Sequence, residues 1–462
     1  MTAKWAQSGR WIGRLATALL VLLAMTHWLA FAIAQADSPT PAIPAATIPA
    51  RVFTVKNFGA IGDGKAVETV AIQKAIDAAS QAGGGKVVVP AGTFLTGPLT
   101  LCSNLDLHLD DGAVVQMSEK IADYPLARAR YRDCITASDC HDISITGNGT
   151  IDGQGGVWWP MYKRQPGSPA ATGERDAAAA TQAAPAALPH RPNMIVLNNC
   201  RRVLVRDVTL KNSPNFHLVP QHCRDVVIDG IHIQAPSNSP NTDGIDPSGW
   251  NFLITRCTID VGDDCIAIKP SGTGPLRPAA DSLSCEDFTI THCTFLHGHG
   301  MSIGNPTAGG LRRLRVGDCT FDGTEAGIRM KSHRGAGNVV EEMTYENLAM
   351  KNVKVAILIT SYYPSIPASP KDDPAAPAGA DTPVWRNIRI RNVTATGSTQ
   401  AGRIIGLPEM HVSDVVMENV QIEAKKGMEI VNADGVKFVN SKVTAASGPA
   451  LTASHADVTG LE

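Results

Sequence analysis

The chain repeats one pattern of apolar positions: apolar, any, apolar, any, any, apolar, any, apolar. Eight segments follow it, and successive starts lie 23 to 45 residues apart. They are VLVRDVTL from Val203, VVIDGIHI from Val226, FLITRCTI from Phe252, FTITHCTF from Phe288, LRVGDCTF from Leu314, MTYENLAM from Met343, IRIRNVTA from Ile388 and VVMENVQI from Val415. This period is typical of a solenoid, in which the shorter steps form bare coils and the longer steps form coils with loops.

Each copy predicts two short strands joined by a bend, because period-two alternation and β-branched residues favour strand over helix. One coil cannot bury its apolar face alone, so successive coils must stack. We therefore predict an all-β protein, a right-handed parallel β-helix. Cys257, Cys293 and Cys319 share one repeat position, which favours a stacked column in the core over a chemical site. Any disulfide pairing within this column stays open.

An amphipathic segment, residues 68–82, precedes the repeats. Its apolar positions 72, 75, 76 and 79 lie on one face of a helix. The first coil of a solenoid would otherwise expose its core and its strand edges, so we predict a short capping helix there.

The N-terminus has the features of an export signal, residues 1–36. Three basic residues precede a long apolar run, and small residues then offer cleavage sites. An uncleaved membrane anchor is the alternative, because the apolar run is long. We expect residues 37–50 to be a linker and residues 51–462 to be a single β-helix domain, secreted or periplasmic and without membrane contact once the signal is cleaved.

Two segments rich in Ala and Pro, at about 164–192 and 364–383, break the periodicity. We expect exposed loops or tethers, which would flank a cleft if they emerge on the same side.

The composition is that of a globular protein, with 44% hydrophobic and 18% charged residues and a formal net charge of −2. This charge gives no reason to expect a nucleic-acid partner, and we expect a monomer. The ten cysteines form no CxxC pair and no cluster with zinc spacing. We therefore expect neither a metal site nor a cofactor.

Polar clusters interrupt the apolar pattern between its copies. They are NTDGID with Asn241, Asp243 and Asp246, GDD with Asp263 and Asp264, GHG with His299, IRMK with Arg329 and Lys331, and SYY with Tyr362 and Tyr363. Each cluster alone is more typical of a turn than of a site. Asp246 in particular is expected to be a turn or ladder residue.

The repeat brings these clusters together. Asp263 lies four residues after Ile259, the last apolar position of its copy, and His299 lies four residues after Phe295, the equivalent position one coil later. Because consecutive coils stack about 4.8 Å apart, the two side chains should be neighbours. By the same count Asp243 lies one coil earlier, and the two cations of IRMK lie one coil later.

Such a strip would hold carboxylates, an imidazole and two cations. Closely spaced carboxylates do not all ionise easily, so at least one should have a raised pKa. Glycoside hydrolysis needs this combination, an acid for the leaving oxygen and a carboxylate that activates water. Arg329 and Lys331 are suited to bind a substrate carboxylate.

The stretch VGDDCIAIKP places two carboxylates directly before a strand. Ile266 and Ile268 predict the buried face of that strand, and strict alternation would bury Asp264 with them. Because Asp263 and Asp264 follow the end of the preceding strand, we predict a bend or bulge with Gly262 as its hinge. This bend should turn both carboxylates outwards, so that Asp264 is not a buried charge.

Taken together, the clusters resemble the signature of the polygalacturonases, glycoside hydrolase family 28. The matching elements are SPNTDGIDP, VGDDCIAIK, HGHGMSIG and GIRMK, in the family's order, and the likeness extends over residues 51–443. The resemblance implies a pectin-lyase-like right-handed parallel β-helix that hydrolyses α-1,4 bonds between galacturonic acids in pectin, with inversion. Its partner would be this polysaccharide, and the chain is most similar to secreted bacterial members.

The resemblance also implies roles in catalysis. Asp263 would be the general acid, and Asp243 and Asp264 would together activate water. His299 would hydrogen-bond within the carboxylate cluster and support the protonation of the acid.

Further roles in substrate binding are implied in the same way. Arg329 and Lys331 would hold the galacturonate at the cleavage point. Asn241 would orient the substrate or the aspartates, and Tyr363 would be the site tyrosine, with Tyr362 as an adjacent rival. The family's usual Arg-Ile-Lys is Arg-Met-Lys here, and both cations should stay on the outer face because only the middle residue changes.

Other activities stay open at this point. An exo-acting galacturonosidase or a rhamnogalacturonan hydrolase would use the same scaffold, and cleavage within the chain or from its end depends on how the two loops close the cleft. A pectate lyase would need calcium and an arginine base. A β-helix without catalysis would only bind pectin.

Overall fold

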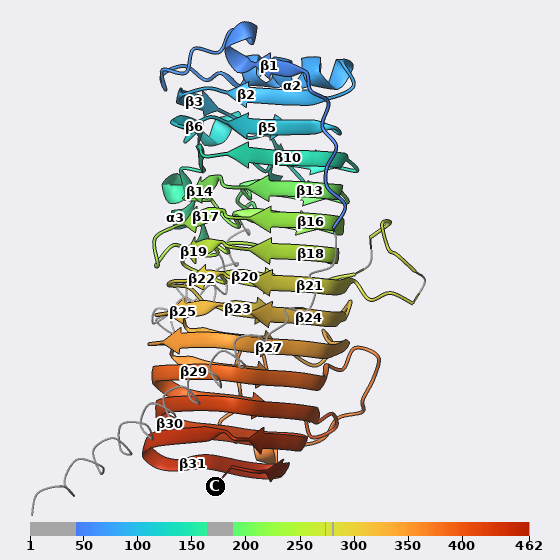
Figure 1. Ribbon diagram of the computed structural model, residues 1–462, viewed down its shortest axis with the longest axis vertical. Helices are drawn as coiled ribbons and strands as arrows, with labels where there is room; N and C mark the ends of the chain where they lie inside the picture. Colours follow the sequence, from blue (N-terminus) through green and yellow to red (C-terminus); the bar gives the residue numbers. More distant parts are fainter. Residues whose placement is uncertain (1–42, 164–187, 273, 280, 462) are drawn as a thin grey trace, which may run out of the picture. The chain divides into compact units, whose positions relative to one another are not determined.

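The computed structural model describes residues 43–163, 188–272, 274–279 and 281–461. From Ile43 onwards the chain forms one compact unit, a stack of β-coils (Figure 1). Parallel strands dominate it, which confirms the predicted right-handed parallel β-helix. The predicted signal segment and most of the first Ala- and Pro-rich segment lie outside the described residues.

The coils build three parallel ladders of strands. The first contains β1 (Val52–Thr54), β2 (Gly85–Val89), β5 (Leu105–Leu109), β10 (His141–Gly147), β13 (Arg201–Arg206), β16 (Cys223–Asp229), β18 (Gly249–Thr255), β21 (Cys285–Thr291), β24 (Leu311–Gly317) and β27 (Val339–Lys351). The second contains β3 (Gly92–Thr96), β6 (Ala113–Met117), β11 (Thr150–Asp152), β14 (Thr209–Lys211), β17 (His232–Gln234), β19 (Thr258–Asp260), β22 (Thr294–Phe295) and β25 (Thr320–Asp322).

The third ladder carries the polar clusters of the sequence. It contains β4 (Leu99–Thr100), β9 (Ile135–Ser138), β12 (Ile195–Asn198), β15 (Leu218–Gln221), β20 (Ile266–Ile268), β23 (Met301–Ile303), β26 (Ala326–Lys331) and β28 (Val355–Thr360).

Long bent strands form the last coils, namely β29 (Val384–Ile405), β30 (Val412–Val439) and β31 (Lys442–Thr459). The shorter elements are the hairpin β7 (Leu126–Ala127) and β8 (Arg130–Tyr131), α3 (Trp159–Lys163), η1 (Val55–Phe58), η2 (Ile121–Asp123), η3 (Gly155–Val157) and η6 (Pro370–Asp372).

Each repeat copy spans the corner between the first and the second ladder. The residue at this corner has a positive φ in all eight copies, as Asp207, Gly230, Arg256, His292, Asp318, Asn347, Asn392 and Asn419. A single residue in this left-handed conformation redirects the chain, and Asp, Asn and Gly adopt it with the least strain. This corner is the bend that the apolar pattern predicts between its two strands.

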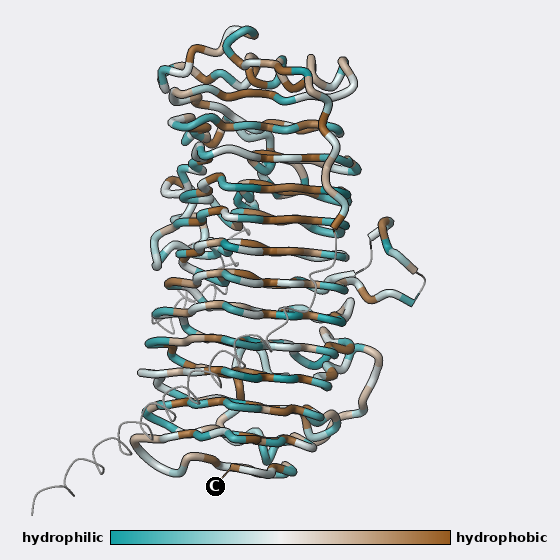
Figure 2. The backbone as a smooth tube through the Cα atoms, viewed as in Figure 1, coloured by the Kyte–Doolittle hydropathy of each residue, from teal (hydrophilic) through white to brown (hydrophobic). Residues whose placement is uncertain are grey.

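The apolar positions of the copies stack in register inside the solenoid. Val203 pairs with Val226, Val226 with Phe252, Phe252 with Phe288, and Phe288 with Leu314. All five side chains are buried, and the rings of Phe252 and Phe288 stack with centroids 4.6 Å apart. Hydrophobic and hydrophilic residues alternate along the coils as this packing requires (Figure 2).

The cysteine column belongs to this core. Cys257, Cys293 and Cys319 are buried free thiols, and the Cys293 backbone N–H donates to Cys319 Sγ at 3.4 Å. This packing confirms the predicted core column.

A helix closes the N-terminal end of the stack, where α2 (Thr69–Gln81) packs against β1, β2 and β4 (Figure 1). The side chains that it buries are Ile72, Ala75, Ile76 and Ala79. These are the four positions that the sequence places on one helical face, so the predicted capping helix is confirmed.

The loop at about 364–383 leaves the third ladder directly after β28 and is held to the β-helix. The Arg334 guanidinium donates to Asp373 Oδ2 at 2.8 Å and to Glu409 Oε1 at 2.6 Å. The Tyr362 hydroxyl also donates to Asp373 Oδ2 at 2.8 Å. Most residues of this loop are exposed, as predicted. These hydrogen bonds nevertheless fix the loop to the β-helix, so it is not a flexible tether.

Among the residues described, none of the helices has the length and apolar character needed to cross a membrane.

Candidate active site

The polar clusters converge on the third ladder, where Ile245 forms single bridges to Leu218 of β15 and Ile266 of β20. Asp243 and Asp246 flank this bridge. The remaining predicted site residues lie before β20 (Asp263, Asp264), before β23 (His299), within β26 (Arg329, Lys331) and after β28 (Tyr363). Segments separated by more than one hundred residues thus meet on one face.

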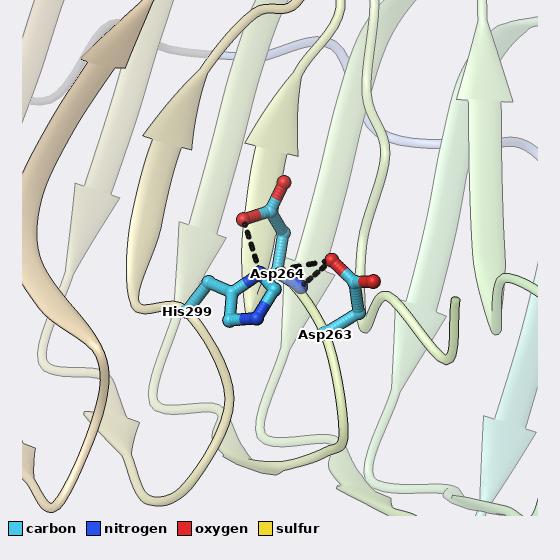
Figure 3. Close-up of side chains that lie close together, drawn as sticks. All are labelled: Asp263, Asp264 and His299. Carbon is cyan, nitrogen blue, oxygen red and sulfur yellow. Dashed lines mark hydrogen bonds and ion pairs between the residues drawn. The ribbon is translucent and has the colours of Figure 1, made fainter. Parts of the chain in front are cut away.

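Asp263 and His299 are neighbours, as the coil count predicts (Figure 3). His299 Nδ1 lies 3.0 Å from Asp263 Oδ1 and 3.5 Å from Asp264 Oδ1. The His299 backbone N–H also donates to the Asp263 carbonyl oxygen at 2.8 Å, which fixes the two coils relative to each other. The imidazole therefore faces both carboxylates.

The chain bends before β20, and this bend decides where Asp264 points. Cys265 and Ile266 both lie in the hydrophobic core. Two consecutive inward side chains reverse the strand alternation, so Asp264 faces the outer side, as predicted. The expectation that Asp264 is not a buried charge is wrong, because its neighbours cover it and leave it 1% exposed.

Gly262 takes part in this bend through close packing. It does not adopt a positive φ. A Cβ at this position would lie 2.2 Å from the Ser239 carbonyl oxygen and 2.8 Å from that of Pro236. Only glycine allows the approach of these two backbone segments.

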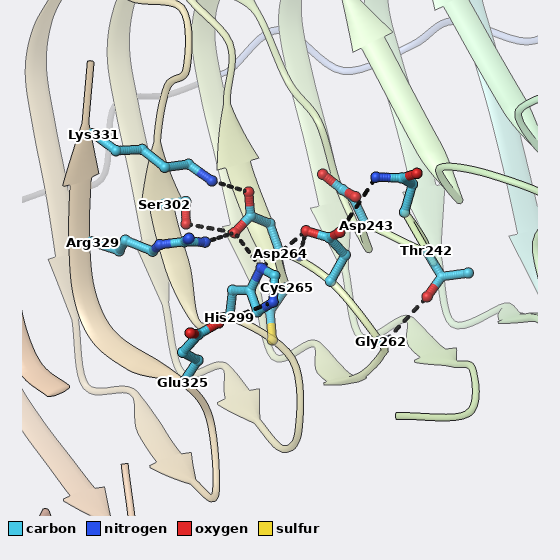
Figure 4. Close-up of polar contacts among 12 residues, drawn as sticks. Thr242, Asp243, Gly262, Asp264, Cys265, His299, Ser302, Glu325, Arg329 and Lys331 are labelled. Atoms are coloured by element: carbon cyan, nitrogen blue, oxygen red, sulfur yellow. Dashed lines mark hydrogen bonds and ion pairs between the residues drawn. The ribbon is translucent and has the colours of Figure 1, made fainter. Parts of the chain in front are cut away.

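The two cations of β26 bind Asp264 (Figure 4). Arg329 Nη1 donates to Asp264 Oδ1 and Lys331 Nζ to Oδ2, at 2.8 and 2.7 Å. The Ser302 hydroxyl adds a third hydrogen bond at 2.8 Å. Met330 packs in the core between the two cations, so the exchange of isoleucine for methionine leaves both on the outer face as predicted.

A further cation, Lys269, joins the carboxylates on the other side. Its Nζ lies 3.4 Å from Asp243 Oδ2, 3.5 Å from Asp246 Oδ2 and 3.9 Å from Asp264 Oδ2. Asp246 is thus a buried member of the cluster and more than the turn residue expected from the sequence. In the sequence, strand alternation places Lys269 on the same face as Ala267, opposite the core residues Ile266 and Ile268. This alternation could have identified Lys269 as a site residue.

Burial raises two pKa values in this cluster. The pKa of Asp243 lies well above its usual value because the carboxyl is buried and faces the charges of Asp246 and Asp263. Burial raises the pKa of Asp246 to about 6, although the Lys269 ammonium opposes the change. A carboxyl with a raised pKa is thus present, but it is not Asp263, the residue that the resemblance implies as the acid, and His299 lowers the pKa of Asp263 instead of supporting its protonation.

The other two carboxylates behave in the opposite way. Burial opposes ionisation of Asp263, yet the contact with His299 holds its pKa below the usual value. Burial alone would raise the pKa of Asp264, but Lys331 and His299 outweigh this effect and hold the pKa well below its usual value. Burial also disfavours the His299 cation, but the two aspartates raise the pKa of the imidazole to about 9.

The second ring nitrogen of His299 has a carboxylate partner of its own. Glu325, which precedes β26, places Oε2 3.0 Å from His299 Nε2. Its side chain is 43% exposed, and the apolar pattern gives no signal for it. Carboxylates therefore face both nitrogens of the imidazole, an arrangement that favours its cationic form.

Asn241 connects Asp263 to a buried arginine. Its Nδ2 donates to Asp263 Oδ2 at 3.5 Å, and its Oδ1 accepts from Arg191 Nη2 at 2.9 Å. Arg191 also donates to the carbonyl oxygens of Pro214 and Pro240. Arg191 lies near the end of the first Ala- and Pro-rich segment, so the described end of that segment lies beside the carboxylates.

The structure distinguishes the two adjacent tyrosines. The Tyr363 ring centroid lies 5.1 Å from Lys331 Nζ, so this ring borders the cluster. Tyr362 faces away and binds the anchored loop through Asp373.

Asp263, Asp264 and His299 also place ligand atoms within 4.8 Å of one another, close enough to consider a metal ion. Both oxygens of Asp264 already accept hydrogen bonds from Arg329 and Lys331. A metal ligand must be neutral imidazole, whereas the raised pKa keeps His299 protonated at neutral pH. The trio is therefore better suited to proton transfer than to metal binding.

Comparison with known proteins gives a consistent result. A family model for glycosyl hydrolases family 28 matches residues 79–445. The chain is 32% identical over 410 residues to a probable polygalacturonase of Vitis vinifera, over 84% of this chain and 78% of the relative. It is 30% identical over 453 residues to an endo-polygalacturonase of Pectobacterium parmentieri, over 93% and 98% of the two chains. The structure of an exopolygalacturonase from Thermotoga maritima matches with a TM-score of 0.69 and 27% identity, over 86% of this chain and 94% of that one.

Proposed function

Because the chain belongs to glycoside hydrolase family 28, we propose that it hydrolyses the α-1,4 bonds between galacturonic acids in polygalacturonate, with inversion. The observation that carries this proposal is the cluster of Asp243, Asp263 and Asp264, in which neighbouring groups drive the pKa values apart. Hydrolysis of a glycosidic bond requires one carboxyl that donates a proton and one that activates water, and this cluster contains carboxyls for both roles.

In the proposed reaction, Asp263 protonates the leaving oxygen as its bond to the anomeric carbon breaks. Asp243, together with Asp264, accepts a proton from the water that attacks the opposite face of the sugar. One turnover therefore ends with the proton on Asp243 and with Asp263 ionised. The pKa directions described above correspond to this end state.

Before the next turnover, one proton must return from Asp243 to Asp263, which leaves the total charge of the cluster unchanged. Substrate assists this return, because a galacturonate carboxylate beside Asp263 disfavours its negative charge and raises its pKa.

Arg329, Lys331 and Tyr363 form the proposed binding wall for galacturonate. Arg329 uses Nη1 on Asp264, and a guanidinium carries further N–H donors that could bind a second carboxylate. Lys331 lies between Asp264 and the Tyr363 ring. These three residues would bind the sugar carboxylate, while Asn241 orients Asp263.

We further propose that the enzyme is secreted or periplasmic, since its substrate is an extracellular polymer. We also propose that it acts as a monomer. The relatives include both endo- and exo-acting enzymes. An early fall in the viscosity of polygalacturonate would indicate cleavage within the chain. Early release of monomer without a fall in viscosity would indicate cleavage from the end.

The direct test is the product formed from unmethylated polygalacturonate. The proposal expects saturated oligogalacturonates whose new reducing ends first appear in the β configuration by NMR. Products with a new double bond, lost on chelation of calcium, would instead identify a lyase. Binding of polygalacturonate without any release of reducing ends would identify a pectin-binding protein.

The roles of acid and base can be separated with an activated aryl galacturonide. Asp263→Asn should lose most activity on polygalacturonate but much less on a substrate whose leaving group needs no proton. Asp243→Asn should be slow on both, and azide should restore its turnover with a glycosyl azide as product. The reverse pattern would show that Asp243 is the acid and Asp263 the base.

A further inference from the structure

Lys269 is a largely buried cation for which the proposed reaction has no use. It follows β20 on the outer face, and its side chain is 24% exposed. Its Nζ lies within 4 Å of Asp243, Asp246 and Asp264, and 5.6 Å from the centroid of the Phe216 ring, whose face favours a cation. Four polar and aromatic contacts are more than a surface lysine needs as an anchor.

The three carboxylates do not depend on Lys269 equally. Asp264 has Arg329 and Lys331 at 2.8 and 2.7 Å. For Asp243 and Asp246, Lys269 is the one cation within 4 Å in the part of the chain that the structure describes. Each of these two carboxyls also has a buried Oδ1 with no hydrogen-bond partner there. Lys269 is therefore their main stabilising contact.

Asp263 is not among the ion-pair contacts of Lys269, since it pairs with His299 instead. A positive charge beside one carboxylate and farther from another favours ionisation of the nearer one. The position of Lys269 thus favours a proton on Asp263 over a proton on Asp243.

We propose that Lys269 is a positioning residue that keeps Asp243 ready to ionise and so assists the return of the proton to Asp263 between turnovers. This inference rests on the proposed function. Lys269 touches the carboxylates and takes no part in bond making. Although burial disfavours its charge, the surrounding aspartates raise the pKa of Lys269, so it remains a cation over the whole pH range of interest.

No other group near Asp243 can replace this charge. His217 places Nδ1 3.0 Å from the Asp243 carbonyl oxygen, but burial lowers its pKa to about 4 and leaves it neutral. Arg191 is affected by the charges of both Asp243 and Asp263, and it forms no ion pair with either of them in the part of the chain that the structure describes. The other charged groups around Asp243 and Asp263 are Asp246, Asp264, His299, Lys331 and Arg329.

The test compares Lys269→Met with Lys269→Arg, which keeps the charge, and with Lys211→Met, which removes a lysine from an exposed pair with Asp152. In Lys269→Met, the acidic limb of the pH profile of kcat/KM on polygalacturonate should move to higher pH by at least about one unit. At pH values on this limb, the shift corresponds to a loss of activity of about tenfold. KM should change little. The arginine variant and the control should keep the wild-type profile.

Two results would overturn the inference. An unchanged pH profile in Lys269→Met would show that Lys269 does not control the ionisation of Asp243. A rise in KM with an unchanged profile would make Lys269 a substrate-binding residue. If the methionine variant does not fold, Lys269→Gln has the same expected profile and keeps a polar end group.

A second readout needs no substrate and separates this inference from the proposed function. Without Lys269, Asp243 and Asp246 should stay protonated to higher pH, so the loss of thermal stability with rising pH should extend to higher pH in Lys269→Met. Wild-type protein that does not hydrolyse polygalacturonate, together with this shift, would refute the proposed function alone. An active wild-type protein without a shift in either readout would refute the role of Lys269 alone.

Discussion

The site and the outer face of the first ladder use the same structural unit, a carboxylate on one coil and a cation on a later coil. On the first ladder, Arg313 Nε lies 2.6 Å from Asp287 Oδ1, with side chains that are 41% and 42% exposed. In the site, Lys331 Nζ lies 2.7 Å from Asp264 Oδ2, with side chains that are 6% and 2% exposed. The distances nearly agree, but the two pairs differ strongly in their access to water.

This difference decides what each pair does. Water and salt screen the exposed pair, which can contribute little to stability and nothing to chemistry. In the buried pair, each charge depends on its partner, because the solvent no longer stabilises it. Stacking of the coils thus provides the same geometry at both places, and burial makes ionisation at the site depend on neighbouring side chains.

Asp264→Asn should give the largest effect, since it leaves Arg329 and Lys331 without their anion. Removal of one partner from a buried ion pair costs about 3 to 5 kcal/mol in the free energy of unfolding. Chemical denaturation of variant and wild type measures this loss, and activity on polygalacturonate should fall with it. A loss below about 1 kcal/mol would show that the pair of Asp264 and Lys331 behaves like an exposed pair, and it would contradict the claim that burial distinguishes the two.

The two sides of this comparison also differ in how well the sequence predicts them. The first two ladders follow from the repeat, because each copy contains both strands and the corner between them. The third ladder has no repeat of its own, since its strands are short and Ile245 takes part through single bridges. Its position could be inferred only from the polar residues between copies.

Within the site, counting from the last apolar position places Asp263 beside His299 without reference to any coordinates. The same count says nothing about Glu325, whose contact depends on how its side chain extends across the coil. It also does not predict which carboxyl holds the proton. That depends on burial and on the position of Lys269 and Lys331, which only the folded chain determines.

Asp246→Asn should change how stability depends on pH. The pKa of Asp246 is about 6 in the folded protein and 3.8 ordinarily, so the folded state binds more protons between these values. Stability contributed by this carboxyl is therefore present below about pH 4 and is lost as the pH rises to about 6. Since one pH unit of displacement corresponds to about 1.4 kcal/mol, the loss amounts to about 3 kcal/mol.

Thermal unfolding of wild type and Asp246→Asn across this window measures the effect. The variant should lose less stability than the wild type between pH 4 and 6, because its amide does not titrate. Parallel curves for the two proteins would show that Asp246 titrates normally and lies outside the coupled cluster.

Glu325→Gln should have a smaller effect, on the alkaline side of the activity profile. The carboxylate at His299 Nε2 favours the imidazolium, so its removal should lower the pKa of His299 from about 9. Because the Glu325 side chain is 43% exposed, we expect a shift of the alkaline limb by at most about one pH unit. The pH profile of kcat/KM and NMR titration of the imidazole measure it.

Asp260→Asn is the matched control, since Asp260 pairs with the exposed His297 at 2.7 Å outside the cluster. It should leave the profile unchanged. An equal shift in both variants would mean that the effect comes from general surface charge and not from the contact with His299.

Asp287→Asn should have the smallest effect and completes the comparison with Asp264→Asn. Asn tolerates the positive φ of 62° at this position, so the substitution removes the charge without backbone strain. The loss of its pair with Arg313 should cost about 0.2 to 1 kcal/mol at low salt and less at high salt. The cost of Asp264→Asn should persist in salt, because counterions do not reach a buried pair. Equal salt dependence in the two variants would mean that water enters the site as freely as it reaches the outer face, and that the ionisation of the carboxylates has another origin.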